Sequence, residues 1–395
     1  MNSLGSPGVA SAQPASSTSA IVAVGHELLG NNRTRWVVIR RLVIPLLLVI
    51  LWVTLGGCQT GPLEKTVQVP SPAGQGLGVE FLAKPSQRHI RVLSFNVGWD
   101  SIFPDDDPQN DNFRQDSSGE QFVRIISATQ PDVLCLQEIN PVRDPQGVAD
   151  ILDEVLPLEA GRRWQAHSGS DNVIAVRFEL IMRSQAVVRT ALITNFGHAM
   201  ALVDLPDGAY KGDLYLICAH FKSQGGERNI SARQEHADAI VGWLRDVKTS
   251  GGEADLPSGT PIIVLGDFNV YDTDPHHHLT TLLTGDIQDE EQYGPDIAPD
   301  WDDTSLTDAL PRHNGAGEAT YTWRDDNQEF NPGELDRILY TDSVLRVDNS
   351  FVLNTMIMSA EELEAVGLQA GDVALAPESG CYDHLPLVVD VVLEP

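Results

Sequence analysis

From His89 onward the chain repeats one pattern, in which short apolar runs are closed by turn residues and separated by amphipathic stretches. The runs are rich in β-branched and aliphatic residues, which is typical of strands buried inside a sheet. The predicted strands cover residues 90–95, 133–136, 173–176, 214–219, 262–265, 337–340 and 385–393.

Two helices are expected between these strands. The clearer one covers about residues 231–248, and its apolar face is formed by Ala237, Ile240, Val241, Leu244 and Val247. Ser231 and Gln234 fit a capping box, which predicts the start of this helix. The second covers 119–129. Strands mixed with helices predict an α/β domain.

The charge balance limits which partners the chain can bind through its overall field. The formal charge of the 395 residues is -30, from 26 basic and 56 acidic residues. Residues 1–57 hold four arginines and one glutamate, so the remainder carries 22 basic and 55 acidic residues. Nucleic acid binding is mostly phosphate neutralisation by Lys and Arg, so this field opposes it. A local basic patch or a bound cation would have to supply the attraction.

The N-terminal segment is expected to direct export. Arg40 and Arg41 precede an apolar run over residues 42–55, which is shorter than the ~20 residues that a membrane-spanning helix needs. The run ends in Gly56-Gly57-Cys58, which resembles the lipobox of bacterial lipoproteins. We therefore expect lipidation at Cys58 and a location in a bacterial cell envelope. An uncleaved apolar anchor is the alternative, and either anchor would tether the protein to a membrane.

Three parts follow from this organisation. Residues 1–58 are expected to be a disordered start plus the signal or anchor, and residues 59–87, rich in Pro and Gly, a flexible tether. Residues 88–395 are the expected catalytic domain. Within it Cys135 and Cys218 lie in apolar runs and are predicted to be buried thiols.

Polar side chains stand where the predicted strands begin or end. A carboxylate beside a buried strand is costly unless it is paired or binds a metal, so we expect one sheet edge to gather them. Oxygen ligands suit Mg²⁺, Mn²⁺ or Ca²⁺, and histidines beside carboxylates suit proton transfer and phosphate contact. The set comprises Asn96, Glu138, His220, Asp267, Asn269, Asp336, Asp383 and His384.

Together these segments resemble the endonuclease/exonuclease/phosphatase superfamily, which has the DNase I-like fold. The resemblance covers about residues 88–394 and implies a four-layer α/β/β/α sandwich of two mixed sheets. The matching stretches, in the expected order, are Ser94–Asn96, Pro131–Glu138, Ala219-His220, Gly266–Asn269, Thr320–Trp323, Leu335–Ile338 and Asp383–Pro386.

The resemblance implies a phosphoesterase that depends on a divalent metal, Mg²⁺ or Mn²⁺, with Ca²⁺ as a further candidate. Glu138 is then the main metal ligand, with Asn96 nearby and Asp383 sharing the ion. A cation neutralises the anionic oxygens of a phosphodiester and stabilises the leaving oxygen.

The same resemblance assigns catalytic roles. Asp267 and Asn269 orient the attacking water and the scissile phosphate. His384 is a general base or an electrostatic partner, held by Asp336, and His220 contacts a non-bridging phosphate oxygen. The division of roles between Asp267 and His384 stays open.

Each of these residues also has an ordinary structural interpretation. Asn96 alone suits a turn, His220 alone suits a buried core histidine, and Gly266–Asn269 suits a turn as well. Lys222 is a candidate contact for a substrate phosphate, but a surface lysine fits its position equally well.

Two further stretches have ordinary interpretations that we favour. The triplet His276–His278 predicts the start of a surface helix rather than a transition-metal site, because consecutive helical residues do not share a face. The acidic stretches 105–107 and 286–303 predict solvated loops, with structural Ca²⁺ as the minority alternative.

Three functions remain in competition. The leading hypothesis is an exported, monomeric nuclease, because the stretch His220–Gln224 resembles a short motif of bacterial extracellular nucleases. The second is a phosphodiesterase or phosphatase acting on a lipid headgroup or a small phosphoester, which the membrane tether favours. The third is a catalytically silent surface lipoprotein, which the full set of site residues disfavours.

Overall fold

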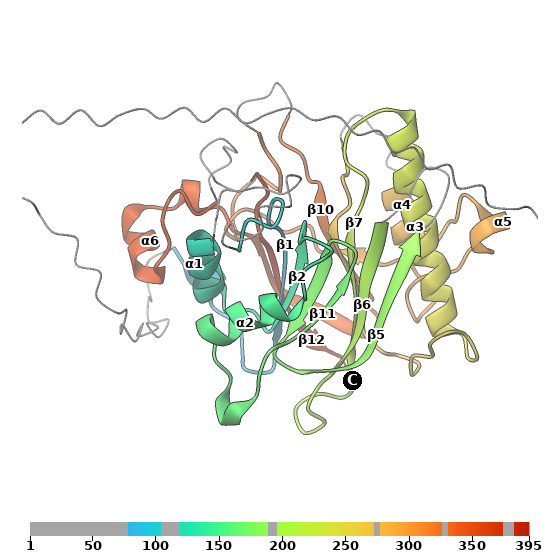
Figure 1. Cartoon of the computed structure of the whole chain (residues 1–395), viewed down its shortest axis with the longest axis horizontal. Coiled ribbons are helices and arrows are strands. Elements are labelled where there is room, and N and C mark those ends of the chain that lie inside the picture. The colour runs from blue at the N-terminus through green and yellow to red at the C-terminus, as the bar shows by residue number, and fades with distance from the viewer. Residues whose placement is uncertain are drawn as a thin grey trace, which may run out of the picture. The chain divides into compact units, whose positions relative to one another are not determined.

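Two six-stranded sheets pack face to face, and helices cover the outer face of each. The computed structural model describes residues 78–103, 119–188, 196–271, 277–325, 331–373 and 383–394. Figure 1 shows α1 and α2 on one side of the paired sheets and α3 and α4 on the other. The described residues therefore form the α/β/β/α sandwich that was expected.

Both sheets are mixed, and each has a parallel pair of strands at its centre, β1–β2 in one and β7–β8 in the other. Sheet A has the order β11 (Leu345–Val352), β12 (Leu387–Leu393), β1 (Ile90–Asn96), β2 (Val133–Gln137), β4 (Asn172–Val176), β3 (Gln165–Gly169). Sheet B has the order β5 (Glu179–Val188), β6 (Phe196–Asp204), β7 (Leu214–His220), β8 (Ile262–Asp267), β10 (Asp336–Tyr340), β9 (Thr307–Asp308).

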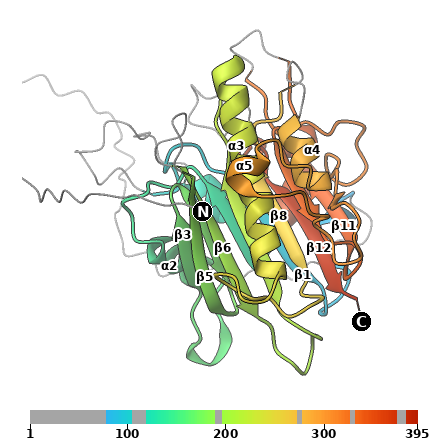
Figure 2. The same ribbon diagram turned by 90° about the vertical axis from the view of Figure 1, so that its right-hand side faces the viewer.

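The parallel pairs require crossover connections, and helices supply them. α1 (Gly119–Thr129) joins β1 to β2, and α3 (Glu227–Lys248) joins β7 to β8. Figure 2 shows α3 and α4 in front of the strands of sheet B. The remaining helices are α2 (Gln146–Val155), α4 (His277–Thr284), α5 (Glu290–Tyr293), α6 (Ala360–Val366) and the 3₁₀ turns Glu80–Leu82, Glu159–Gly161 and Thr355–Ile357. Within the described ranges, no helix has the length and apolar character needed to cross a membrane.

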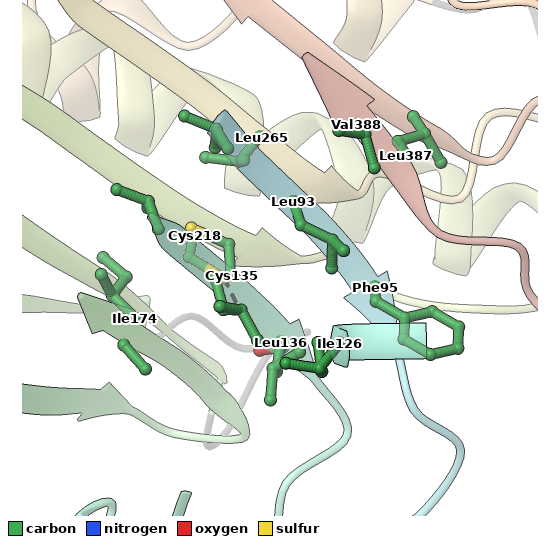
Figure 3. Close-up of a cluster of buried hydrophobic side chains, with 14 of the residues drawn as sticks. Leu93, Phe95, Ile126, Cys135, Leu136, Ile174, Cys218, Leu265, Leu387 and Val388 are labelled. Atoms are coloured by element: carbon green, nitrogen blue, oxygen red, sulfur yellow. Dashed lines mark hydrogen bonds between the residues drawn. The ribbon is translucent and has the colours of Figure 1, made fainter. Parts of the chain in front are cut away.

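The larger core lies between the sheets and is formed by side chains from both. Figure 3 shows Cys135 of β2 and Cys218 of β7 side by side there, among Leu93, Ile174 and Leu265. Both cysteines are free and buried, as the sequence predicts. A second cluster joins sheet B to α3 and α4.

The structure differs from the sequence prediction at several boundaries. α3 begins at Glu227, four residues early, with Gly226 at its N-cap in a left-handed conformation (φ 97°). The proposed capping box at Ser231 is therefore wrong, because Ser231 lies inside the helix. Phe81, assigned to the tether, instead packs edge to face on Phe351 of β11, with ring centroids 5.0 Å apart. Cys58 lies outside the described residues.

A buried ion pair links β1 to β12 inside sheet A. The guanidinium of Arg91 donates to both carboxylate oxygens of Asp390, at 2.6 and 2.7 Å. Its third nitrogen donates to the carbonyl oxygens of Leu82 and Thr129, at 2.7 and 2.8 Å. All three nitrogens of the guanidinium are thus hydrogen-bonded, which helps to offset the cost of burying the pair.

We expect Asp390→Ala to lower the free energy of unfolding by about 3–5 kcal/mol, because it leaves Arg91 buried and unpaired. The double variant Arg91→Met, Asp390→Leu should be more stable than Asp390→Ala, since it removes both charges. Urea denaturation measures both. Asp150→Asn, at the exposed pair with Arg163, is the control and should leave the free energy of unfolding almost unchanged. An Asp390→Ala variant as stable as that control would contradict the expectation.

Candidate active site

Strand ends from both sheets meet at one edge of the sandwich. β1 and β2 run parallel, so Asn96 and Glu138 emerge at the same end of sheet A. β7 and β8 run parallel, so His220 and Asp267 emerge together from sheet B. β10 runs antiparallel to β8, which sets its first residue, Asp336, directly opposite Asp267. The sheet topology therefore gathers these side chains.

Asp267 lies at the centre of the group and is only 2% exposed. Its Oδ1 accepts the backbone N–H of Asn269 at 2.9 Å, and its Oδ2 accepts Nδ2 of Asn96 at 3.1 Å. Burial raises the pKa of Asp267 to about 6, and the carboxylate of Asp336 adds to the rise, although His384 and His220 oppose it. A carboxylate with this pKa is ionised at neutral pH and is matched to accept a proton there.

Two histidines flank this carboxylate. Nε2 of His220 lies 3.6 Å and Nε2 of His384 lies 3.7 Å from Oδ2 of Asp267. Both distances exceed an ordinary hydrogen bond, so these nitrogens face the carboxylate without being bonded to it. The other ring nitrogen of each histidine is held by a carboxylate: Asp171 holds His220 at 2.7 Å and Asp336 holds His384 at 2.9 Å.

These surroundings keep both rings charged. Burial alone would lower the pKa of His220, but the carboxylates of Asp171, Asp267 and Glu138 raise it to about 10. Burial opposes the charge of His384 as well, yet Asp336 and Asp267 hold its pKa well above the usual value. Each Nε2 is therefore a charged N–H donor directed toward the central carboxylate, which suits the binding of an anionic phosphate oxygen.

Glu138 follows β2 with a φ of 64°, a left-handed conformation that is uncommon for a residue with a side chain. Its carboxylate accepts Nδ2 of Asn96 at 3.1 Å and the backbone N–H of Trp99 at 2.8 Å. Burial raises the pKa of Glu138, although His220 and the bond from Asn96 lower it in part. A buried carboxylate of this kind gains stability from a nearby cation.

Asp383 approaches the same carboxylate from the loop before β12. Its Oδ2 accepts the indole N–H of Trp323 at 3.3 Å, and its charge contributes to the raised pKa of Glu138. Of the predicted metal ligands, Glu138 and Asn96 are joined by a hydrogen bond, and Asp383 lies near enough for its charge to act on Glu138.

A second group of side chains, separate from Glu138, also has the spacing of metal ligands. Ligand atoms of Asp267, Asp336 and His384 all lie within 4.8 Å of one another. Oδ1 of Asp336 is buried and has no hydrogen-bond partner among the described residues, as expected of an oxygen that faces a cation. The charge on His384 opposes a metal ion beside that ring, so the oxygen donors around Glu138 are the better first position for Mg²⁺ or Mn²⁺.

The side chains of Asn269 and Lys222, both predicted to contact substrate, hydrogen-bond to neighbouring groups of the protein. Nδ2 of Asn269 donates to the carbonyl of Phe221 at 3.1 Å, and its Oδ1 accepts the hydroxyl of Tyr271 at 2.9 Å. These two hydrogen bonds fix the loop in which the backbone N–H of Asn269 donates to Asp267. Lys222 is half-buried and donates to the carbonyl and hydroxyl oxygens of Ser223, at 3.2 and 3.3 Å. Direct contact of either residue with substrate stays a prediction.

Sequence reasoning missed two residues that hold the site together. Asp171 lies in the turn between β3 and β4, and the stretch Gly169–Asn172 has the composition of an ordinary turn. Thr322 donates its hydroxyl to Oδ2 of Asp336 at 2.6 Å and accepts the backbone N–H of the same residue. Thr322 lies in the stretch Thr320–Trp323 that matches the family, so the sequence indicated this residue but not its hydrogen bond to Asp336.

The histidine triplet is only partly as expected. His277 begins α4 and is exposed, but His278 is 2% exposed and its ring lies 6.1 Å from that of Phe221. The prediction of a surface position is therefore wrong for His278, because α4 packs this residue onto α3 and sheet B. His276 lies outside the described residues, as does the acidic stretch 105–107.

The pKa of His220 gives a stability test in the metal-free protein. An unfolded histidine has a pKa of about 6.5, so the stability contributed by the charged ring is complete below that pH and is lost as pH rises through about 10. Asp171→Asn removes the largest favourable contact and should shift this loss to lower pH. Thermal melts in EDTA should then fall less between pH 7 and 10 for Asp171→Asn than for the wild type. Equal falls would contradict this account, and Asp150→Asn is the charge-matched control.

The chain resembles solved structures at low sequence identity. It is similar to the human nocturnin catalytic domain at 18% identity, covering 78% of this chain and 96% of that one, with a TM-score of 0.45. It is also similar to an endonuclease/exonuclease/phosphatase protein from Bacteroides vulgatus (18% identity, 78% and 99% covered, TM-score 0.47). A third structure is a mannosyl-6-phosphatase from Bacteroides thetaiotaomicron (15% identity, 77% and 99% covered, TM-score 0.46).

No curated protein sequence matches the chain. The model of the Endonuclease/Exonuclease/phosphatase family matches residues 93–357, which is more than half of the chain and includes most of the strand ends described above. The protein therefore belongs to the endonuclease/exonuclease/phosphatase family.

Proposed function

We propose that the protein is a divalent-metal phosphodiesterase with nuclease-type chemistry. Members of the family are phosphoester hydrolases. The observation that carries the proposal is the carboxylate of Asp267, faced at 3.6 and 3.7 Å by Nε2 of His220 and His384, each of them held by a second carboxylate. This arrangement combines a proton acceptor with two charged donors.

The residues can divide the reaction as follows. His220 and His384 donate from Nε2 to non-bridging oxygens of the phosphate, which places the phosphorus beside Asp267. The Asp267 carboxylate, with its pKa near 6, accepts the proton of the attacking water. Asn269 and Asn96 hold the two oxygens of that carboxylate and so fix the direction of proton transfer.

The metal would be held by Glu138 with Asp383 and Asn96. When bound, it supplies Lewis-acid neutralisation of the phosphate and of the leaving oxygen. The raised pKa of Glu138 supports this placement, since burial raises it even though the charged ring of His220 lies 3.9 Å from its Oε1.

Hydrolysis of bis-p-nitrophenyl phosphate tests the function. With Mn²⁺ or Mg²⁺ we expect turnover that EDTA abolishes, and a fall in kcat of about 10²–10³ for His384→Ala, the range for loss of one preorganised donor to the phosphate oxygens. Glu138→Gln should lose activity together with calorimetric metal binding. Glu364→Gln, an exposed change on α6, should keep both. Activity that survives EDTA, or a Glu138→Gln variant that matches the wild type, would overturn the proposal.

A second candidate function is hydrolysis of small phosphodiesters rather than nucleic acid. The surplus of 30 acidic charges favours it, because a long polyanion would be repelled by most of the surface. The wild-type rates on plasmid DNA and on small diesters distinguish the two. A nuclease should prefer DNA, and that rate should fall steeply with salt.

We also propose that the enzyme is exported and tethered by lipid at Cys58, on the lipobox-like ending of the N-terminal apolar run. Cys58→Ser should then move the protein from the membrane fraction to the aqueous fraction and abolish incorporation of labelled palmitate. Cys381→Ser is the matched control and should change neither. Label that persists in Cys58→Ser would contradict lipidation at this residue.

A further inference from the structure

Two loops follow the parallel strands β7 and β8 at the edge of the sandwich where the catalytic residues meet. We call residues 221–226 the β7 loop, because they follow His220, and residues 268–271 the β8 loop, because they follow Asp267. The loops pair at their start, where the backbone N–H of Phe221 donates to the carbonyl of Asp267 at 2.8 Å. The contacts that hold the rest of the two loops therefore bear on the position of the central carboxylate.

The hydroxyl of Tyr271 joins the two loops beyond their start. It donates to Oδ1 of Asn269 in the β8 loop at 2.9 Å, and it accepts the backbone N–H of Gln224 in the β7 loop at 3.1 Å. Both partners have a left-handed backbone, with a φ of 51° at Asn269 and 71° at Gln224. Such conformations are uncommon for residues with a side chain and persist where the surroundings hold them. One hydroxyl thus contacts a residue of uncommon conformation in each loop.

Arg233 of α3 supports the same arrangement. Its side chain is fully buried, and its Nη1 donates to the carbonyl oxygens of Lys222 and Gln224 at 2.7 and 2.8 Å. The guanidinium also lies over the ring of Tyr271, 5.2 Å from the centroid, a distance at which a cation and an aromatic face attract each other. The cost of burying this charge is therefore offset by contacts that fix both the β7 loop and the ring of Tyr271.

Asn269 connects this network to the reacting carboxylate. Its Nδ2 donates to the carbonyl of Phe221 at 3.1 Å, and its backbone N–H donates to Oδ1 of Asp267 at 2.9 Å. Its side chain is thus held by the β7 loop and by Tyr271, while its backbone orients the carboxylate. Catalytic groups must be held within about 0.5 Å of their productive position by supporting contacts of this kind.

We propose that Tyr271 is a positioning residue for the hydrolysis, which acts through Asn269 on the orientation of Asp267 and does not touch the substrate. The inference rests on the proposed phosphodiesterase function. Arg233 is the support of Tyr271, because its guanidinium fixes the aromatic ring and the peptide groups on either side of the Gln224 N–H.

Tyr271→Phe tests this role, because it keeps the ring over Arg233 and removes only the hydroxyl. With Mn²⁺ and bis-p-nitrophenyl phosphate we expect kcat to fall roughly tenfold, since even small displacements of a reacting group are costly, and KM to stay within about twofold of the wild type. Tyr210→Phe, the same change before β7 at the opposite end of that strand from His220, is the matched control and should keep the wild-type kcat. An unchanged kcat in Tyr271→Phe, or an effect on KM alone, would overturn the proposal.

A double-mutant cycle with Asn269→Gly separates positioning from a general loss of stability. Glycine removes the side chain that Tyr271 contacts, and the left-handed backbone stays accessible to it. Tyr271→Phe should then lower kcat by less than about twofold in the Asn269→Gly background, since the contact that it breaks is already gone. Thermal melts check that each variant is folded in the assay. A tenfold fall in both backgrounds would show that Tyr271 acts independently of Asn269 and would contradict the proposal.

Amide hydrogen exchange in the metal-free protein, followed by NMR, separates this failure from that of the proposed function. The Gln224 amide is bonded to the Tyr271 hydroxyl, so it should exchange about tenfold faster in Tyr271→Phe and at the wild-type rate in Tyr210→Phe. If the wild type does not hydrolyse bis-p-nitrophenyl phosphate, the proposed function fails, and the exchange rate alone decides whether the hydroxyl joins the two loops. Equal exchange in Tyr271→Phe and the wild type would overturn that contact.

Discussion

The buried carboxylate of Asp267 is the group around which the whole catalytic edge is arranged. An ionised carboxylate that is 2% exposed is costly, and the protein offsets this cost with two imidazolium rings at 3.6 and 3.7 Å. Each ring is in turn held by a further carboxylate. The result is a row of alternating charges in which every member depends on its neighbours.

The fold supplies this row through its two parallel strand pairs. Parallel strands end at the same edge of a sheet, so β7 and β8 bring His220 beside Asp267, while β1 and β2 bring Asn96 beside Glu138. The hydrogen bond from Asn96 to Asp267 then joins the two sheets at the site itself. Antiparallel neighbours add further residues, because their register is fixed by the strand pairing. β10, for example, sets Asp336 directly opposite Asp267 on β8.

Much of this arrangement could be predicted from the sequence, because buried strands have a strong apolar signature. The seven predicted runs fall within or along β1, β2, β4, β7, β8, β10 and β12, and the eight proposed site residues follow from the strand ends. Most of the strands that escaped prediction lie at sheet edges, such as β3 and β11, whose partly exposed polar residues weaken the apolar signal. β6 escaped as well, although it lies between β5 and β7 and its residues 199–203 are buried.

The contacts between distant segments could not be predicted. Asp171 lies in a hairpin turn, and its bond to His220 exists only because β4 and β7 face each other across the core. The start of α3 was misplaced for a related reason, since Gly226 can take the left-handed conformation that opens the helix without a side-chain cap. Ser231 has the local features of a helix N-cap, but the connection from β7 to β8 already begins the helix at Glu227.

The rate of Asp267→Asn with Mn²⁺ on bis-p-nitrophenyl phosphate, measured beside its thermal stability, tests the central claim most directly. Because Asp267 helps to keep both histidine rings charged and accepts two hydrogen bonds, the amide also perturbs its neighbours, and the melting temperature shows whether the variant is folded in the assay. The account predicts a fall in kcat of about 10²–10⁴, as for the loss of a proton acceptor, in a variant that stays folded at the assay temperature. A stable Asp267→Asn variant with wild-type turnover would contradict it.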